Sequence, residues 1–236
     1  MYVVAEYPEK SYQNYKNVFS NLGIKNIYKL DISTREDAFN KKNVELINNS
    51  NLLFFTGGDQ LRITSMIGGS PVYDAVKELC ANGGLIAGTS AGASVMSDTM
   101  IVQGEDDESP HKCTLKMSPG LGLVNNIIID QHFAQRGRIG RLLTAIAQNP
   151  EVLGIGIDED TAIVVSDKGK AEVIGSGAVY FIDGSSIDYS NVSEQYSEEV
   201  LSIFNVKLHV LKEGNKFNLL DKVPFEEEKN FYENHK

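Results

Sequence analysis

Residues 85–93 read Leu85-Ile86-Ala87-Gly88-Thr89-Ser90-Ala91-Gly92-Ala93, an apolar run that passes through a Gly-x-Ser-x-Gly turn into a segment of helical character. This pattern is typical of a nucleophile elbow, a strained strand-to-helix turn that raises a serine hydroxyl above a parallel sheet. Gly on each side of the serine leaves room for the neighbouring elements. The stretch therefore predicts an α/β fold with Ser90 as a nucleophile. The alternative is a structural turn in which Ser90 caps the helix.

The sequence on either side of this turn alternates between strand-like and helix-like segments. Apolar runs that predict buried strands lie at residues 2–5, 26–30, 52–55, 85–87, 126–129 and 152–157. Helix-length segments lie at residues 12–22, 44–49, 61–67, 72–80 and 139–148. Such alternation favours a mostly parallel sheet with helices on both faces.

The last third of the chain has a different pattern. Short β candidates at residues 162–165, 172–174, 179–182 and 206–211 are separated by Gly, Asp and Ser turns. We expect antiparallel strands that extend one edge of the same domain, so that residues 1–236 form a single domain. The polar stretch 104–119 is expected to be an exposed loop.

Composition excludes several classes of function. The 236 residues include 22 basic and 32 acidic side chains, a net charge of -10 that disfavours nucleic-acid binding. Cys80 and Cys113 belong to no ligand cluster, so we expect neither a disulfide framework nor a metal site, and Cys80 is expected to be a buried core thiol. No apolar run reaches the roughly 18 residues of a membrane span. With no signal-like start, the cytoplasm is the simplest location.

A serine nucleophile needs a base, and His132 is the best placed of the four histidines. It follows the expected strand at 126–129, and the carboxyl ends of parallel strands meet at one edge of the sheet. The third member should be a carboxylate that orients the imidazole. Glu159, after the strand at 152–157, is our first choice, and Glu108 in the acidic loop is the alternative. Spacing does not decide between them.

Two further motifs lie near these residues in the expected fold. Gly57-Gly58-Asp59-Gln60 follows the strand at 52–55, so the Gly58 N–H is a candidate oxyanion donor beside that of Ala91. The alternative is a tight turn without a ligand. Arg136, Arg138 and Arg141 follow the proposed base, and guanidinium groups recognise carboxylates. They predict a pocket for an acidic substrate. The alternatives are a solvated helix start or ion pairs with the acids at 158–160.

Taken together, these motifs resemble the cyanophycinase family, peptidase family S51, which also includes aspartyl dipeptidases. The motifs that carry the resemblance are Gly57-Gly58-Asp59-Gln60, Gly88-Thr89-Ser90-Ala91-Gly92-Ala93, Asp130-Gln131-His132-Phe133 with Arg136, Arg138 and Arg141, Gly156-Ile157-Asp158-Glu159 and Leu208-His209-Val210-Leu211. The resemblance implies a three-layer, flavodoxin-like sandwich of the class I glutamine amidotransferase type. It further implies a Ser-His-Glu triad at Ser90, His132 and Glu159, and no cofactor.

The resemblance also implies a substrate and a substrate pocket. Cyanophycinases are serine-type exopeptidases that cleave cyanophycin, multi-L-arginyl-poly-L-aspartate, into β-Asp-Arg dipeptides. Positions that match the family's pocket are Gln60, Asp130, Gln131, Arg136, Arg138 and Arg141. Family members are commonly homodimers. Two alternatives stay open: an aspartyl dipeptidase-like hydrolase and a catalytically silent, ligand-binding relative. Members usually begin with one more strand, so we expect this chain to lack the first strand of the family.

Overall fold

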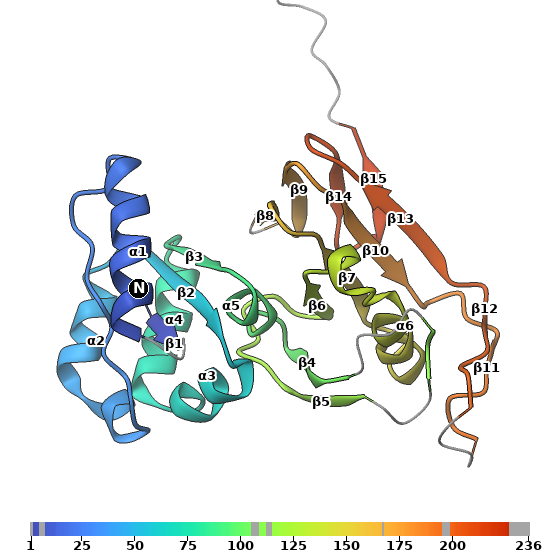
Figure 1. Ribbon diagram of the computed structural model, residues 1–236, viewed down its shortest axis with the longest axis horizontal. Coiled ribbons are helices and arrows are strands. Elements are labelled where there is room, and N and C mark those ends of the chain that lie inside the picture. Colours follow the sequence, from blue (N-terminus) through green and yellow to red (C-terminus); the bar gives the residue numbers. More distant parts are fainter. Residues whose placement is uncertain are drawn as a thin grey trace, which may run out of the picture.

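The computed structural model describes residues 2–4, 8–104, 109–111, 115–166, 168–194 and 199–226. The first part of the chain, blue to teal in Figure 1, forms a helix-rich half, and the yellow-to-red part forms a strand-rich half. The segment between them carries helix α5 (Ala91–Ser94) and the antiparallel strands β4 (Thr99–Gln103) and β5 (Lys116–Pro119). Ser90 therefore lies where the two halves meet.

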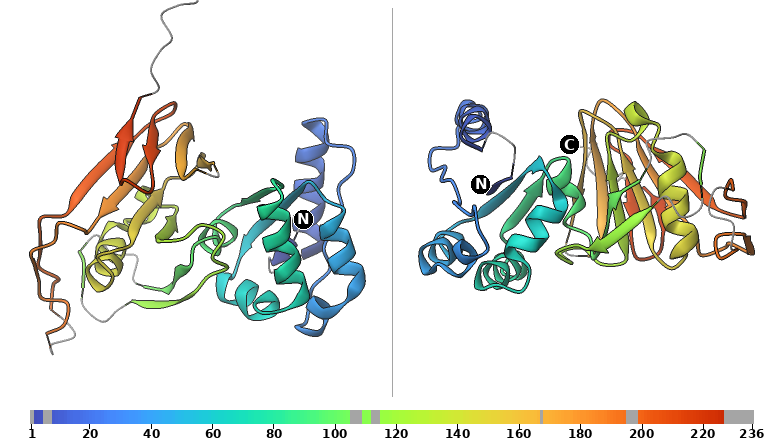
Figure 2. Two further views of the ribbon diagram at one scale, coloured as in Figure 1. Left: turned by 180° about the vertical axis from the view of Figure 1, so that it is seen from behind. Right: turned by 60° about the horizontal axis from the view of Figure 1, so that its bottom comes forward.

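The helix-rich half is built on a parallel sheet. Its strands are β1 (Tyr2–Val4), β2 (Leu52–Gly58) and β3 (Leu85–Gly88), in the order β1-β2-β3. Helix α1 (Pro8–Asn21) lies on one face, and helices α2 (Lys41–Asn48) and α4 (Pro71–Ala81) lie on the other (Figure 2). The sheet and its helices form the layered arrangement that the alternation of segments predicts.

Capping side chains set where the helices of this half begin. The carboxylate of Asp59 accepts a hydrogen bond from the Arg62 N–H at the start of α3 (Gln60–Ile67). The Ser70 side chain accepts from the Tyr73 N–H at the start of α4, where Pro71 takes the first helical position. Both caps satisfy N–H groups that have no acceptor inside the helix.

The strand-rich half is built on a second sheet. Strands β6 (Ile127–Gln131) and β7 (Leu153–Ile157) are parallel, and β10 (Val179–Asp183) and β13 (Lys207–Leu211) add to β7 in antiparallel fashion, in the order β13-β10-β7-β6. Alternate side chains point to opposite faces of a strand. Ile127 and Ile129 accordingly pack in one core cluster and Ile128 in another.

Each face of the second sheet has its own cover. Helix α6 (Ile139–Gln148) covers the Ile128 face, and its Leu142 and Ile146 are fully buried. The opposite face packs against an antiparallel sheet of β8 (Thr161–Val165), β9 (Lys170–Gly175), β14 (Lys216–Asn218) and β15 (Val223–Phe225). The rings of Phe181 and Phe217 stack at 4.0 Å between these two sheets. Both faces of strand β6, which leads to His132, are therefore buried.

The remaining elements are short. They are the 3-10 helices η1 (Glu36–Phe39) and η2 (Ala134–Arg136) and the strand pair β11 (Tyr189–Ser190) and β12 (Ile203–Phe204). In the described part of the chain, no helix is both long enough and apolar enough to cross a bilayer.

The predicted α/β class is confirmed, but four details of the prediction are wrong. Residues 26–29 form no strand: the one buried residue of this run, Leu30, makes an isolated β-bridge, and the residues before it are not buried. The stretch 104–119 is not only a loop, since β5 lies in it. The parallel ladder is interrupted between β3 and β6, and β8 and β9 leave the main sheet. Cys80 is exposed on α4, whose buried face carries Val72, Ala75 and Val76.

Candidate active site

Ser90 sits in the strained turn that the sequence predicts between β3 and α5. Its backbone has φ 54° and ψ -122°, outside the regions that L-residues ordinarily adopt. The two flanking glycines are required by close approach. A Cβ on Gly88 would lie 2.2 Å from the Gly92 carbonyl oxygen, and one on Gly92 would lie 2.3 Å from the Phe55 carbonyl oxygen. The Gly-x-Ser-x-Gly spacing thus lets the turn pack directly on itself and on β2.

A chain of two hydrogen bonds runs from Ser90 through His132 to Glu159. Ser90 Oγ lies 3.1 Å from His132 Nε2, and His132 Nδ1 lies 2.7 Å from Glu159 Oε1. A carboxylate only accepts hydrogen bonds, so a neutral His132 carries its proton on Nδ1 and leaves Nε2 to accept from the serine hydroxyl. This is the arrangement in which an imidazole acts as general base toward a serine.

The topology of the second sheet brings His132 and Glu159 together. Strands β6 and β7 are parallel neighbours, with Gln131 in register with Ile157. His132 follows the first strand directly, and Glu159 follows the second after one intervening residue. The His132 side chain is 27% exposed and that of Glu159 is 55% exposed, so the pair lies at the surface of this edge. Glu108, the alternative acid, lies outside the described residues.

The structure places Gly57 and Ala91 against the serine. A Cβ on Gly57 would lie 3.3 Å from Ser90 Cβ, so the end of β2 passes directly beside Ser90. Gly58, the residue that we expected to supply an oxyanion donor, is the next residue along and has φ 142°. Ala91 is buried at the first position of α5. Because α5 has only four residues, its dipole is small, and any oxyanion stabilisation rests on the N–H groups themselves.

Two of the three clustered arginines are engaged with Asp130, which is 1% exposed. Arg141 donates from Nε to Asp130 Oδ2 at 2.6 Å and from Nη2 to Asp130 Oδ1, a bidentate pair. Arg138 Nη1 lies 3.4 Å from Asp130 Oδ1, and it also donates to the backbone oxygen of Gln131 at 2.6 Å and to its Oε1 at 3.1 Å. The proposed ion pairs with the acids at 158–160 are therefore wrong for the described residues: Asp130 is the partner acid.

The remaining pocket candidates lie around this cluster. Arg136 is exposed, and no other described residue makes a polar contact with its guanidinium. The Gln131 Nε2 lies 3.4 Å from the hydroxyl of buried Ser94. Gln60 is turned toward β4, where its Nε2 donates to the Ile101 carbonyl oxygen at 2.9 Å. Arg136 is thus the cluster's most accessible positive charge.

Sequence reasoning missed four residues that surround the hydrogen-bond chain. Gly57 was named only as part of the Gly-Gly turn, whereas Ser94, Gln135 and Asp158 received no specific role. The sequence presents Asp158 as one of three consecutive acids, and no local pattern indicates that this residue is only 9% exposed. Ser94 and Gln135 carry no local signal, because their contacts depend on elements distant in sequence.

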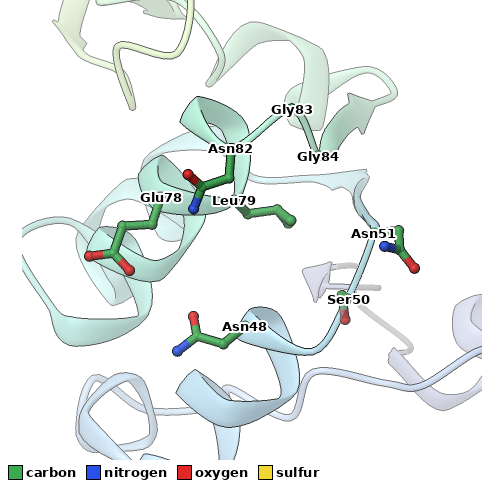
Figure 3. A pocket seen from close by; sticks show the side chains of 8 residues that line it. All are labelled: Asn48, Ser50, Asn51, Glu78, Leu79, Asn82, Gly83 and Gly84. Atoms are coloured by element: carbon green, nitrogen blue, oxygen red, sulfur yellow. The ribbon is translucent and has the colours of Figure 1, made fainter.

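Two cavities among the described residues lie away from these side chains. The polar cavity in Figure 3 is lined by Asn51 and Gly84, which precede β2 and β3, and by residues of α2 and α4. A second hollow lies between the segment from Ile24 to Leu30 and the beginning of β2. Neither is lined by Ser90, His132 or Glu159, because both lie toward the amino ends of strands whose carboxyl ends carry the site.

Comparison with known proteins identifies the class. The family model of Peptidase family S51 matches residues 3–173, so the chain belongs to this family of serine peptidases. The cyanophycinase of Geminocystis herdmanii is 38% identical over 205 residues, which span 86% of this chain and 75% of that protein. The cyanophycinase of a Nostoc species is 38% identical over 206 residues, 87% of this chain and 69% of that protein.

A solved structure supports the same fold. The crystal structure of a peptidase from an acI-B1 Actinobacterium matches this chain with a TM-score of 0.66 at 22% sequence identity, covering 92% of this chain and 82% of the other. At that identity the likeness concerns the fold, which is consistent with the flavodoxin-like architecture.

Proposed function

We propose that this peptidase is a cyanophycinase, a serine exopeptidase that hydrolyses cyanophycin to β-Asp-Arg dipeptides. The observation that carries the proposal is the hydrogen-bond chain from Ser90 through His132 to Glu159. The identity of 38% to two cyanophycinases supports the substrate class.

In the proposed mechanism, His132 Nε2 accepts the Ser90 proton as Ser90 Oγ attacks the scissile carbonyl carbon. Glu159 stabilises the imidazolium that forms. The protonated His132 then gives its proton to the leaving amine, which departs and leaves an acyl-enzyme on Ser90. A water molecule, deprotonated by His132, hydrolyses this ester and restores the serine. Each proton moves between groups of this chain and the substrate, so the sequence of steps needs no cofactor.

The oxyanion of the tetrahedral intermediate needs hydrogen-bond donors close to Ser90. We assign this role to the N–H groups of Ala91 and Gly58. Ala91 directly follows the nucleophile, and the first N–H groups of a helix have no acceptor within it. Gly58 follows Gly57, whose backbone packs against Ser90.

Substrate recognition divides among the residues beyond His132. The exposed Arg136 is suited to a carboxylate of the β-linked aspartyl unit. Arg138 and Arg141 hold Asp130 and Gln131 in place, so their contribution to binding is to orient these two side chains. Gln60, at the start of α3 and hydrogen-bonded to the backbone of β4, completes the proposed pocket.

Assembly and location belong to the same proposal. We propose a cytoplasmic homodimer, and size-exclusion chromatography with light scattering on the purified protein would detect the dimer. A monomer at micromolar concentration would contradict it.

The decisive experiment is turnover of purified cyanophycin, with the products identified by mass spectrometry. Release of β-Asp-Arg by the wild-type protein, lost in Ser90→Ala, supports the proposal. Cleavage of dipeptides with N-terminal aspartate but not of cyanophycin would instead define an aspartyl dipeptidase. Binding of β-Asp-Arg without turnover and without labelling of Ser90 by a fluorophosphonate would define a catalytically silent relative.

A further inference from the structure

Asp158 is a buried carboxylate that the mechanism above does not use. It lies directly after β7 and is 9% exposed. Its Oδ1 accepts a hydrogen bond from the Ala134 N–H at 3.0 Å, and its Oδ2 accepts one from the Ala178 N–H at 3.1 Å. Ala134 lies two residues after His132, and Ala178 directly precedes β10. One carboxylate therefore ties the histidine turn to the frame of the second sheet.

A second hydrogen bond joins the same two turns in the opposite direction. The side-chain Oε1 of Gln135 accepts from the Glu159 N–H at 3.1 Å. The backbone of the turn that carries His132 thus donates a hydrogen bond to the Asp158 side chain. The Gln135 side chain of that turn accepts one from the backbone of the turn that carries Glu159. We call this pair of contacts, made by Asp158 and Gln135, the reciprocal clamp.

The histidine turn needs such support because its backbone is strained. His132 has φ 51°, in the left-handed region that few residues other than glycine adopt. Such a conformation persists only where the surrounding structure holds it. The buried Phe133 ring restrains one side of this turn, because it packs directly on Gly156, where a Cβ would lie 2.6 Å from the ring. The reciprocal clamp holds the other side of the turn.

We propose that Asp158 and Gln135 are positioning residues that align His132 with Glu159 and, through it, with Ser90. This inference rests on the proposed function. Neither residue contacts Ser90 or His132 through a side-chain hydrogen bond in the described structure, so neither is a catalytic residue. Their effect is exerted through the backbone at Ala134 and at Glu159. A displacement of about 1 Å in a catalytic group can reduce turnover about 100-fold.

The test uses Asp158→Asn and Gln135→Ala in the full-length protein. Asparagine keeps one acceptor, but its NH₂ group faces an N–H donor, so one of the two Asp158 contacts is lost. We expect kcat on cyanophycin to fall about 10- to 100-fold for Asp158→Asn, with KM within about twofold of the wild-type value. Gln135→Ala should lower kcat by a smaller factor. A residue that only binds substrate would instead change KM.

Labelling of Ser90 by a fluorophosphonate gives a readout that is independent of the natural substrate. The labelling rate reports activation of the serine by His132, and we expect it to fall in parallel with kcat in both variants. Asp160→Asn is the matched control. Asp160 is exposed, accepts from Ser176 at 2.7 Å, and has φ 52°, which asparagine tolerates. This control should label at the wild-type rate.

The outcomes separate this inference from the proposed function. Wild-type protein that labels at Ser90 but cleaves no cyanophycin refutes the substrate proposal, while the labelling rates of the variants still test the clamp. Folded Asp158→Asn and Gln135→Ala proteins that both label and turn over within about twofold of wild type would overturn the clamp. If Asp158→Asn does not fold, the Gln135→Ala variant alone tests the clamp. The Gln135 side chain is exposed, so its removal should not prevent folding.

Discussion

The hydroxyl of Ser90 lies 3.1 Å from Nε2 of His132, although the two residues are 42 positions apart in the chain. Ser90 follows β3 of the first sheet, and His132 follows β6 of the second. These strands share no ladder among the described residues, so the contact joins the two halves of the molecule at the carboxyl ends of their strands. The proposed catalytic apparatus therefore depends on how the halves pack.

Removal of the proposed nucleophile, Ser90, should abolish turnover. We expect Ser90→Ala to lower kcat by about 10⁴-fold or more, because loss of the serine in a serine peptidase removes covalent catalysis altogether. The measurement is kcat on cyanophycin, and circular dichroism should show an unchanged fold. Ser176→Ala, which removes an exposed hydroxyl bonded to Asp160, is the control and should retain full activity. Full activity of Ser90→Ala would refute the proposed mechanism.

Glu159 should affect rate without affecting folding. Its side chain is 55% exposed, so Glu159→Gln should leave the thermal unfolding temperature nearly unchanged. Glutamine can donate to Nδ1 and so favour the wrong imidazole tautomer, which we expect to reduce kcat by about 10²- to 10⁴-fold. In the Ser90→Ala background the same change should have almost no further effect. A fully active Glu159→Gln protein would point to another acid, with Glu108 tested next.

The arginine cluster should divide into structural and accessible members. Arg141→Ala removes the bidentate partner of the buried Asp130 carboxylate, while the longer contact with Arg138 at 3.4 Å stays, so we expect a loss of unfolding free energy of up to about 3–5 kcal/mol. Arg136→Ala removes an exposed side chain and should change stability by less than about 0.5 kcal/mol while raising KM. Urea unfolding and steady-state kinetics of both variants check this division. Equal stability of the two proteins would contradict it.

Asp183 should make the protein less stable in acid. Burial alone raises the pKa of this carboxyl, but hydrogen bonds from Ser185 and the charge of Lys222 outweigh burial and hold the pKa below its ordinary value of 3.8. A carboxyl with a lowered folded-state pKa contributes stability that is complete above its ordinary pKa and lost as the pH falls through the folded value.

Thermal unfolding of the wild-type protein and of Asp183→Asn from pH 7 to pH 3 measures this contribution. The stability difference between the two proteins should be largest near neutral pH and should shrink at the acidic end. A difference that stays constant over this range would show that Asp183 acts only through packing. Asp188→Asn, a change at a carboxylate that bonds the Asn205 side chain, is a suitable control.

Much of the fold could be predicted from the sequence because its elements carry strong local signals. Helix α6 begins and ends at the expected residues 139 and 148, and the strands that precede Ser90 and His132 lie where their apolar runs predicted. The strand predicted at residues 26–30 is wrong for a non-local reason, because an apolar segment becomes a strand only where another strand pairs with it along its length. The break between β3 and β6 depends on packing in the same way.

The sequence by itself determined which chemical groups this protein presents and that Ser90, His132 and Glu159 each follow a strand. Local patterns suffice for that, because the spacing of glycines and apolar residues sets each turn. Only the tertiary structure decided which ion-pair and hydrogen-bond partners these side chains have. It paired Arg141 with Asp130, turned Gln60 toward β4, and set Asp158 and Gln135 around the histidine turn. These contacts join segments distant in the chain, and their geometry comes from the register of β6 and β7 and the packing beneath them.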